Sequence, residues 1–300
     1  MGADPGTGWL EEGATLTASW TVREILSWTR GFFHSGGIAQ PRLEAEILLA
    51  HTLDVERLHL YLTPDKPLTL EERARFRDFV KERRSGVPLQ YIIGEVSFYG
   101  LRFQVGREAL IPRSETEELI ERALSLAPRE QPIQCLDLGT GSGVIAVCLA
   151  RFLPRATLTA TDISEAALAM ARRNAEMNGV ADRIHFRRSD WFEDVEGCFD
   201  LVVSNPPYVE RAALAGLASE ITEHEPHVAL DGGRDGTGCI AALADGLSTH
   251  LRAGGVVVIE IGDGQGARVV ALFEQGGLAD VSVERDLSGR ERFVVGQWPS

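Results

Sequence analysis

The 300 residues suffice for two ordinary domains, and the 44% that are hydrophobic suffice for a buried core. A formal charge of −14 argues against a large surface that grips a nucleic-acid backbone. Apolar runs such as Val256 to Ile259 are too short to span a bilayer. The cysteines form no C-x-x-C pair, which favours reduced thiols and a cytoplasmic location: Cys135, Cys148, Cys198 and Cys239.

The residue pattern of the first part of the chain is typical of a small helical domain. Residues 1–18 are glycine-rich and lack a basic segment ahead of an apolar run, which excludes a standard secretory signal and predicts a disordered leader. Over residues 19–86 apolar side chains recur at helical spacing. Helices are expected over Thr21–His34, from Pro41 through Leu53, and over Pro67–Arg84 with Thr69 as N-cap.

Residues 87–112 change in texture and predict a linker. Tyr, Ile, Val and Phe dominate from Leu89 to Val105, and Gly94 and Gly100 interrupt them, which predicts a β-hairpin. A further helix is expected over Glu115–Leu126.

The remainder, within residues 113–300, alternates strand and helix patterns. Strands are expected at Gln134–Leu138, Thr157–Thr161, Ile184–Arg187, Leu201–Ser204, Val256–Ile261, Val281–Arg285 and Arg292–Gly296. Helices are expected near Val144–Phe152, Glu165–Asn178, Gly238–Leu251 and Gly266–Gln275. This alternation predicts an α/β fold with a mostly parallel sheet covered on both faces. The gap before the last strand is too short for a helical crossover, so that strand should pair antiparallel.

A glycine-rich turn follows the first of these strands. Its glycines would let the backbone approach a ligand closely. The spacing is G-x-G-x-G, whereas the dinucleotide fingerprint requires G-x-G-x-x-G. An open turn that carries Asp137 suits a ligand with a sulfonium and an amino-acid tail better than a pyrophosphate. The residues of the turn are Gly139, Thr140, Gly141, Ser142 and Gly143.

Acidic residues follow the next two strands. Asp162 ends the second strand, where a carboxylate can accept both hydroxyls of a ribose. Asp190 follows the third strand and could accept from an adenine amino group, with Trp191 packed against the ring. Asp190 is equally interpretable as a helix cap.

The stretch Ser204-Asn205-Pro206-Pro207-Tyr208 follows the fourth strand. The two prolines end the strand, because neither can donate a ladder hydrogen bond, and they leave a stiff loop. The side-chain oxygen of Asn205 can accept one N–H of a carboxamide or ring amino group, and the carbonyl of Pro206 can accept the other. Tyr208 offers an aromatic face beside the flat group. A Pro-Pro loop with a capping Asn is the alternative interpretation.

These residues resemble the class I S-adenosylmethionine-dependent methyltransferases whose N-P-P-Y motif serves to methylate amide or exocyclic nitrogens. Further segments are similar to the HemK-type protein-(glutamine-N5) methyltransferases, which methylate the glutamine of the Gly-Gly-Gln motif of peptide-chain release factors. These segments are Gly86–Gly94, Phe98–Gly100, Ile111–Glu117, Glu225–Pro226, Ala229–Gly236 and Glu260–Gly262. The resemblance covers Thr21 to Gln297. Ser114 departs from it, since the family usually has proline there.

The resemblance implies a Rossmann-like sheet with an antiparallel last strand, a small helical N-terminal domain and a β-hairpin linker. It implies S-adenosylmethionine as cofactor and S-adenosylhomocysteine as product. Residues 139–143 with Asp137 would cradle the methionine part, Asp162 the ribose, and Asp190 and Trp191 the adenine. Asn205 would touch cofactor and glutamine. The catalytic set would be Asn205, Pro206 and Tyr208. Asn205 would bind the substrate, and Pro206, Pro207 and Tyr208 would complete the substrate pocket.

The expected partner is a release factor, and the chain is expected to act as a monomer without nucleic acid or a membrane. Two rival functions stay open: a methyltransferase for amino groups of DNA or RNA, and a nucleotide-binding protein that reads NAD through Asp162. Two further segments are more simply interpreted as structural. His224 and His227 have metal-ligand spacing, but Pro226 lies between them and no third ligand stands out, so no metal is expected. The segment Asp231–Gly238 is expected to be a surface loop near the substrate entrance.

Overall fold

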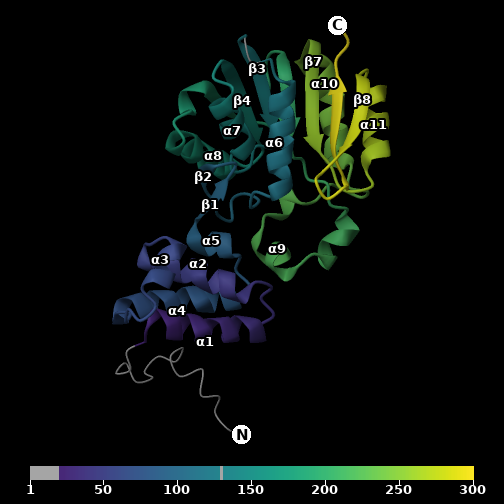
Figure 1. The fold of residues 1–300 in the computed structure, drawn as a ribbon. Helices are drawn as coiled ribbons and strands as arrows, with labels where there is room; N and C mark the ends of the chain where they lie inside the picture. The colour runs from purple at the N-terminus through teal and green to yellow at the C-terminus, as the bar shows by residue number, and fades with distance from the viewer. Residues whose placement is uncertain (1–19, 129–130) are drawn as a thin grey trace. The chain divides into compact units, whose positions relative to one another are not determined.

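The computed structural model describes residues 20–128 and 131–300 (Figure 1). The leader expected over residues 1–18 lies outside the described residues. The chain divides into two compact units, one that ends at Ile93 and one that begins at Gly94. None of the helices in the described ranges is long and apolar enough to cross a membrane.

The first unit is helical, as the sequence predicts. Its helices are α1 (Val22–Ser35), α2 (Pro41–Leu53), α3 (Arg57–Leu62), α4 (Leu70–Arg84) and α5 (Leu89–Ile93). Thr69 caps α4 by accepting from the backbone N–H of Glu72, whose side chain accepts from the Thr69 N–H in return. The apolar faces meet in one core around Phe33, Leu48 and Phe76, each of them fully buried.

Two short helices of this unit depart from the expected pattern. The β-hairpin predicted from Leu89 was wrong over its first residues, because Leu89–Ile93 form α5 and only the part from Glu95 onward pairs as strands. Ile92 is buried in the core of the helical unit, and this packing overrides the strand preference of Tyr and Ile. The helix α3 was not predicted, since its six residues are too few to show a period.

The second unit begins with a β-hairpin and continues as an α/β domain. The hairpin strands are β1 (Glu95–Phe98) and β2 (Leu101–Gln104). The helices are α6 (Ser114–Leu126), α7 (Val144–Phe152), α8 (Glu165–Met177), α9 (Ser219–His224), α10 (Gly238–His250) and α11 (Gly266–Gln275). The sheet strands are β3 (Ile133–Leu138), β4 (Ala156–Asp162), β5 (Ile184–Arg188), β6 (Phe199–Ser204), β7 (Leu251–Glu260), β8 (Ala279–Arg285) and β9 (Glu291–Gln297).

The seven strands follow the order β5-β4-β3-β6-β7-β9-β8. Neighbours from β5 to β7 pair parallel, and β9 pairs antiparallel with both β7 and β8, which confirms the expected antiparallel last strand. The chain moves from β3 to β4 on one side and later to β6 on the other. The carboxyl end of β3 is therefore the switch point at which open α/β sheets bind ligands.

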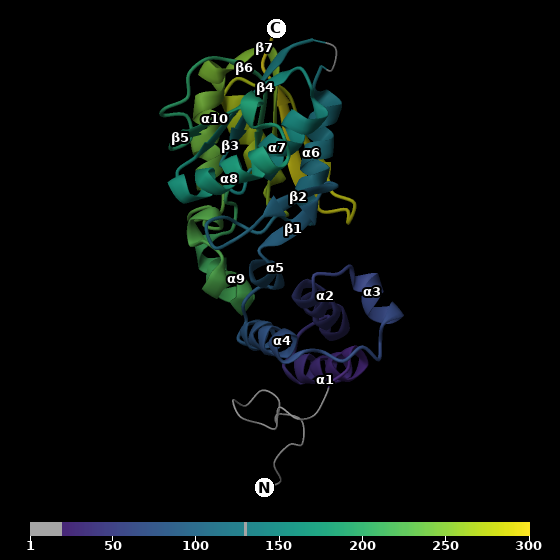
Figure 2. The ribbon, with the colours of Figure 1, turned by 90° about the vertical axis from the view of Figure 1, so that its left-hand side faces the viewer.

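Helices cover both faces of this sheet, and alternate residues of the central strand β3 face opposite cores. Cys135 of β3 joins a core with α6 and α7, whereas Leu136 and Leu138 join a core with α10 and α11. Figure 2 looks onto α7 and α8, which lie in front of the strands in that view. The strand β3, buried except at Gln134, is thereby held rigidly beneath the turn that follows it.

Candidate active site

Three neighbouring strands end level with one another and bring the predicted residues to one edge of the sheet. Leu138 of β3 pairs with Thr161 of β4 on one side and with Ser204 of β6 on the other. The Ser204 hydroxyl also donates to the Leu138 carbonyl at 2.7 Å, which ties β6 to β3 at the point where the strands end. The glycine turn, Asp162 and Asn205 follow directly.

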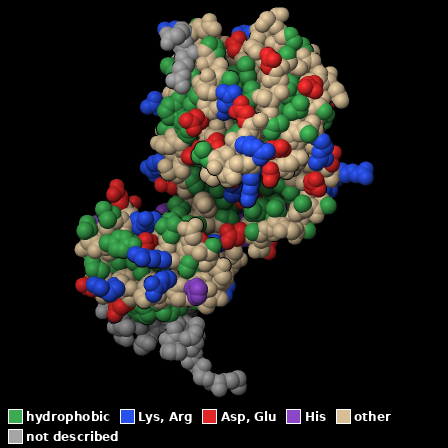
Figure 3. All heavy atoms as spheres, turned by 45° about the vertical axis from the view of Figure 1, so that its right-hand side comes forward, with side chains coloured by type: hydrophobic (Ala, Val, Ile, Leu, Met, Phe, Trp, Pro, Cys, Tyr) green, Lys and Arg blue, Asp and Glu red, His purple; other side chains and the backbone are tan. Residues whose placement is uncertain are grey.

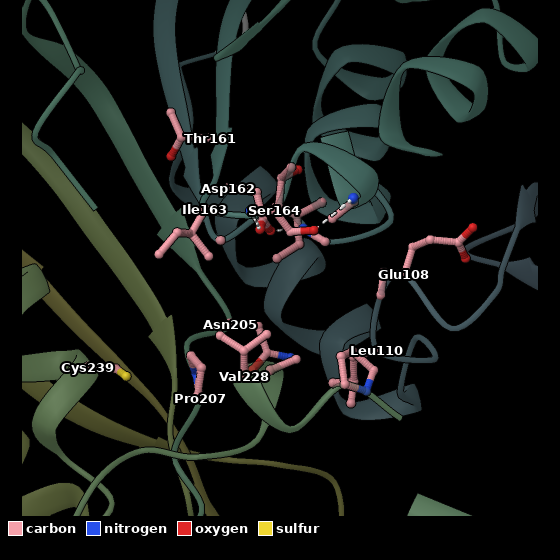
Figure 4. A pocket seen from close by; sticks show the side chains of 18 of the residues that line it. Glu108, Leu110, Thr161, Asp162, Ile163, Ser164, Asn205, Pro207, Val228 and Cys239 are labelled. Atoms are coloured by element: carbon pink, nitrogen blue, oxygen red, sulfur yellow. Dashed lines mark hydrogen bonds between the residues drawn. The ribbon is translucent and has the colours of Figure 1, made fainter. Parts of the chain in front are cut away.

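A cavity of about 460 Å³ opens at this edge, a volume within the range of small-molecule sites. Figure 4 shows Asp162, Asn205 and Pro207 among the side chains around it. The sequence-predicted residues that line it are Gly139, Thr140, Gly141, Asp162, Asp190, Trp191, Asn205 and Pro207. The other predicted residues do not line it: Asp137, Ser142, Gly143, Pro206 and Tyr208.

Asp137 lies beneath the glycine turn and is fully buried. Its Oδ2 accepts from the Thr140 hydroxyl at 2.6 Å and from the backbone N–H of Ala146 at 3.0 Å. Burial raises the pKa of Asp137 to about 7, against the effect of these two hydrogen bonds. The carboxyl group therefore fastens the turn to the start of α7 from below.

The turn itself requires glycine at its last position. Gly143 has a φ of 84°, in the left-handed region, and a Cβ added there would lie 2.9 Å from Cβ of Ala171 on α8. The absence of a Cβ at Gly143 lets the start of α7 lie close to α8. Ser142 supports the same junction, because its carbonyl accepts from the side-chain amide of Asn174 at 2.8 Å.

We expect Gly143→Ala to destabilise the protein more than Gly139→Ala does. Both glycines have positive φ, but nothing lies within 4 Å of a Cβ at Gly139. The clash with Ala171 should lower the free energy of unfolding by about 1–3 kcal/mol beyond the loss in the matched control. Denaturant unfolding of both variants measures the difference; equal losses would mean that the helices move apart at little cost.

Asp162 ends β4 with both carboxylate oxygens engaged by backbone. Oδ2 accepts from the N–H of Gly141 at 2.9 Å, and Oδ1 accepts from the N–H of Ser164 at 2.9 Å. Burial raises the pKa of this carboxyl group, while those hydrogen bonds oppose the rise. Each oxygen keeps a lone pair for a further donor, as two ribose hydroxyls would require. Asp162 thus links the glycine turn to the wall of the cavity.

Asp190 and Trp191 stand at the end of β5. Asp190 is exposed, and Trp191 has a φ of 49°, which turns the chain at that point. The hydroxyl of Ser189 donates to the Trp191 carbonyl at 2.8 Å and accepts from the N–H of Asp194 at 3.0 Å. The turn is therefore closed by side-chain hydrogen bonds, and both predicted residues line the cavity.

The Asn205 loop divides between the cavity and the protein interior. Asn205 and Pro207 line the cavity, and the Asn205 side-chain nitrogen donates to the Thr116 hydroxyl at 3.0 Å. Pro206 is buried, and the Tyr208 hydroxyl donates to Glu260 Oε1 at 3.1 Å. Burial raises the pKa of the Tyr208 hydroxyl and raises that of Glu260 to about 7. Tyr208 is thus fixed through its hydroxyl group.

Two segments of the cavity wall were not predicted as site residues. One precedes α6 and enters its first turn: Glu108, Ala109, Leu110, Pro112, Arg113 and Thr116. The other lies around the short helical turn before α10: Pro226, His227, Val228 and Ala229. Most of these side chains are apolar or small, so they carry no chemical signature in the sequence. For Pro112, Arg113, Thr116, Pro226 and Ala229 the quoted family segments were a signal, and the other residues lie outside those segments.

A partly buried ion pair joins these two segments. The Glu225 side chain is 2% exposed and accepts from the Arg113 guanidinium and, at 3.1 Å, from the N–H of Ile111. Glu117, one helical turn further on, accepts from the N–H of Tyr99 in the hairpin at 2.6 Å. These acidic residues therefore hold the cavity wall and the hairpin in place.

The two histidines of the H-x-x-H pair have different surroundings. His227 lines the cavity, and its Nε2 lies 2.8 Å from the Thr222 carbonyl. His224 ends α9 with both ring nitrogens buried. Across residues 20–128 and 131–300, no three His, Cys, Asp or Glu side chains gather as a metal site would require. Asp231, which also lines the cavity, accepts from the N–H of Gly233 at 2.9 Å and closes its own loop.

Comparison with known proteins places both units. Residues 24–94 match the family model of the PrmC N-terminal domain, and residues 119–234 match that of the Methyltransferase small domain. A release factor glutamine methyltransferase of Geobacter sulfurreducens is 42% identical over 279 residues, which cover 93% of this chain and 97% of that protein. The protein of the same name from Cereibacter sphaeroides is 45% identical over 266 residues, 89% of this chain and 94% of that one.

A solved structure shares the fold at lower identity. A methyltransferase from Pyrococcus furiosus is 19% identical, with a TM-score of 0.52 over 68% of this chain and 92% of that one.

Proposed function

The chain belongs to the family of release factor glutamine methyltransferases, and from this premise we propose its reaction. It transfers a methyl group from S-adenosylmethionine to the side-chain amide nitrogen of the glutamine in the Gly-Gly-Gln motif of peptide-chain release factors. One observation carries the proposal: Asp162 and Asn205 line the same cavity at the carboxyl ends of β4 and β6, the two strands that flank β3. A clamp for an amide and an acceptor for a ribose are thereby held together on rigid strands.

The residues of the cavity fit the proposed cofactor. The open backbone of Gly139 and Gly141 would hold its methionine part, and the remaining lone pairs of Asp162 would accept from its ribose. Asp190 and Trp191 would flank the adenine. When bound, the cofactor supplies an electrophilic methyl group on a sulfonium. Asp137, Ser142 and Gly143 would contribute indirectly, by shaping the turn.

Asn205 would act by orientation. An amide nitrogen is a poor nucleophile because its lone pair is delocalised, so the site must hold it in line with the methyl carbon. The side-chain oxygen of Asn205, which lines the cavity, would accept one substrate N–H. The carbonyl of Pro206 is proposed to accept the other, although Pro206 does not line the cavity in this structure. As the substrate nitrogen takes the methyl group and the bond from that methyl to the sulfonium breaks, positive charge develops on the nitrogen, and these hydrogen-bond acceptors would stabilise it. The nitrogen would then lose one proton to water. Pro207 would line the substrate pocket, and Tyr208 would hold the loop.

The release factor would be the protein partner, and the helical unit would serve to dock it. The proposed functional parts are the helices (residues 19–86), the hairpin linker (87–112) and the methyltransferase domain (113–300). The chain would act as a cytoplasmic monomer, in keeping with the buried free thiols of Cys135 and Cys148.

A nucleic-acid amino group is the rival substrate, and the surface charge disfavours it. The chain carries a formal charge of −14, and Figure 3 shows acidic and basic side chains interspersed over the face in view. A nucleic-acid backbone is normally gripped by a basic patch or stripe.

The proposal is tested by peptide mass spectrometry of a release factor after incubation with the protein and S-adenosylmethionine. The added methyl should lie on the Gly-Gly-Gln glutamine, and a methyl on any other residue contradicts the proposal.

Asp162→Ala should weaken cofactor binding by about 1–3 kcal/mol, because buried ribose hydroxyls lose their acceptor. Titration calorimetry with S-adenosylmethionine measures the loss, and Asp182→Ala, an exposed position, is the control. NAD should bind neither variant nor the wild type. Unchanged affinity in Asp162→Ala would show that another group holds the ribose, and tight NAD binding would favour the nucleotide-binding alternative.

A further inference from the structure

We propose that Thr116 and Glu260 are positioning residues for methyl transfer: they fix the Asn205 side chain with its nitrogen toward the protein and its oxygen toward the substrate amide. The inference rests on the proposed function and extends it to residues outside the Asn205 loop. Thr116 lies in the first turn of α6, and Glu260 is the last residue of β7. Both are remote in sequence from Asn205.

A chain of hydrogen bonds connects the three residues. The Asn205 side-chain nitrogen donates to Thr116 Oγ1 at 3.0 Å, and the Thr116 hydroxyl donates to Glu260 Oε2 at 2.8 Å. The other carboxylate oxygen of Glu260 accepts from the Tyr208 hydroxyl at 3.1 Å. Glu260 therefore holds both ends of the loop: Asn205 through Thr116, and Tyr208 directly.

Thr116 sets which atoms donate and which accept in this series of hydrogen bonds. A threonine hydroxyl has one proton, and here it points at Glu260. The hydroxyl can then only accept from its other neighbour, so the amide nitrogen of Asn205, and not its oxygen, must face Thr116. The planar amide places its oxygen on the opposite side. Reversing the amide would set two acceptors against each other and would present N–H groups to the substrate N–H.

Burial makes this arrangement strict. Thr116 is 3% exposed and Glu260 is fully buried, so water cannot readily replace a missing partner. The neighbouring Arg292 donates to the Ile261 carbonyl at 3.2 Å and, at the same distance, to Asp286. Burial raises the pKa of Glu260 to about 7, and the positive charge of Arg292 opposes that rise. Above this pH the carboxylate accepts from both hydroxyl groups and donates to neither.

The experiment compares Thr116→Val, Thr116→Ser and Glu260→Gln in the full-length protein. Valine keeps the shape but has no hydroxyl, and serine keeps the hydroxyl. In Glu260→Gln the new amide N–H can donate to Thr116, which frees the hydroxyl proton for the Asn205 oxygen and lets the Asn205 amide reverse. Three quantities are measured: the S-adenosylmethionine affinity, the KM for a release factor and the kcat of methyl transfer.

We expect kcat to fall about tenfold or more in Thr116→Val and in Glu260→Gln, with cofactor affinity and KM nearly unchanged, since only the reacting amide loses its orientation. Thr116→Ser should keep most of the wild-type kcat. Wild-type kcat in folded Thr116→Val, or an equal loss in Thr116→Ser, overturns the inference. If Thr116→Val does not fold, Glu260→Gln decides alone, and a wild-type kcat in that folded variant overturns the inference. A wild-type enzyme that leaves the release factor unmethylated contradicts the proposed function instead.

Discussion

Asn205→Ala is expected to reduce glutamine methylation by orders of magnitude while the protein stays folded. An oriented acceptor at the reacting atom contributes about 3–4 kcal/mol to the transition state, and alanine has no acceptor. The fold should persist because Pro206 and Pro207 stiffen the loop and the Tyr208 hydroxyl remains bound to Glu260. Initial rates with a release factor, together with the melting temperature and cofactor affinity, measure the effect.

Asn205→Asp is the finer variant for the same position. Aspartate keeps an oxygen toward the cavity but replaces the N–H that Thr116 accepts with a second oxygen. We therefore expect a partial loss, smaller than that of Asn205→Ala. A rate for Asn205→Ala equal to that of the wild type, with unchanged cofactor binding, would show that this loop is not the active site.

The second large effect is expected on removal of the helical unit. Because the second compact unit begins at Gly94, a chain that starts there keeps every residue that lines the cavity. It should bind S-adenosylmethionine with nearly the affinity of the full chain. Methylation of an intact release factor should collapse, because the docking surface is lost and only the contacts of the glutamine loop remain.

A short peptide with the Gly-Gly-Gln motif is the control for this deletion. A peptide too small to reach the helical unit gains nothing from docking, so both chains should methylate it equally slowly. Equal rates of the two chains with the intact release factor would remove the docking role. Loss of cofactor binding on deletion would instead indicate that the second unit depends on the first for its stability.

The α/β domain was predictable because its signals are local. A continuous apolar run such as Leu201–Val203 predicts a buried strand, and the two prolines after Asn205 mark where it ends. The bounds of α7 and α11 are confirmed to the residue. Parallel strands end at one edge, so the expectation that Asp162 and Asn205 share a site followed from order alone, and both line the cavity.

The remainder depends on packing across long sequence separations. Nothing local marks Leu89–Ile93 as helical, because the core of the helical unit decides it. The glycine turn likewise did not reveal that Asp137 is buried, is bonded to Thr140 and does not itself line the cavity. Thr116 is separated from Glu260 by 144 positions, so their hydrogen bond is visible only in the folded chain.

The most direct measurement of the central claim is transfer of a radiolabelled methyl group from S-adenosylmethionine to four acceptors. These are a release factor, its variant with the Gly-Gly-Gln glutamine replaced by alanine, bulk DNA and bulk RNA. We predict label in the unmodified release factor only. Label in the alanine variant to the same extent, or in DNA or RNA with none in the release factor, would contradict the account.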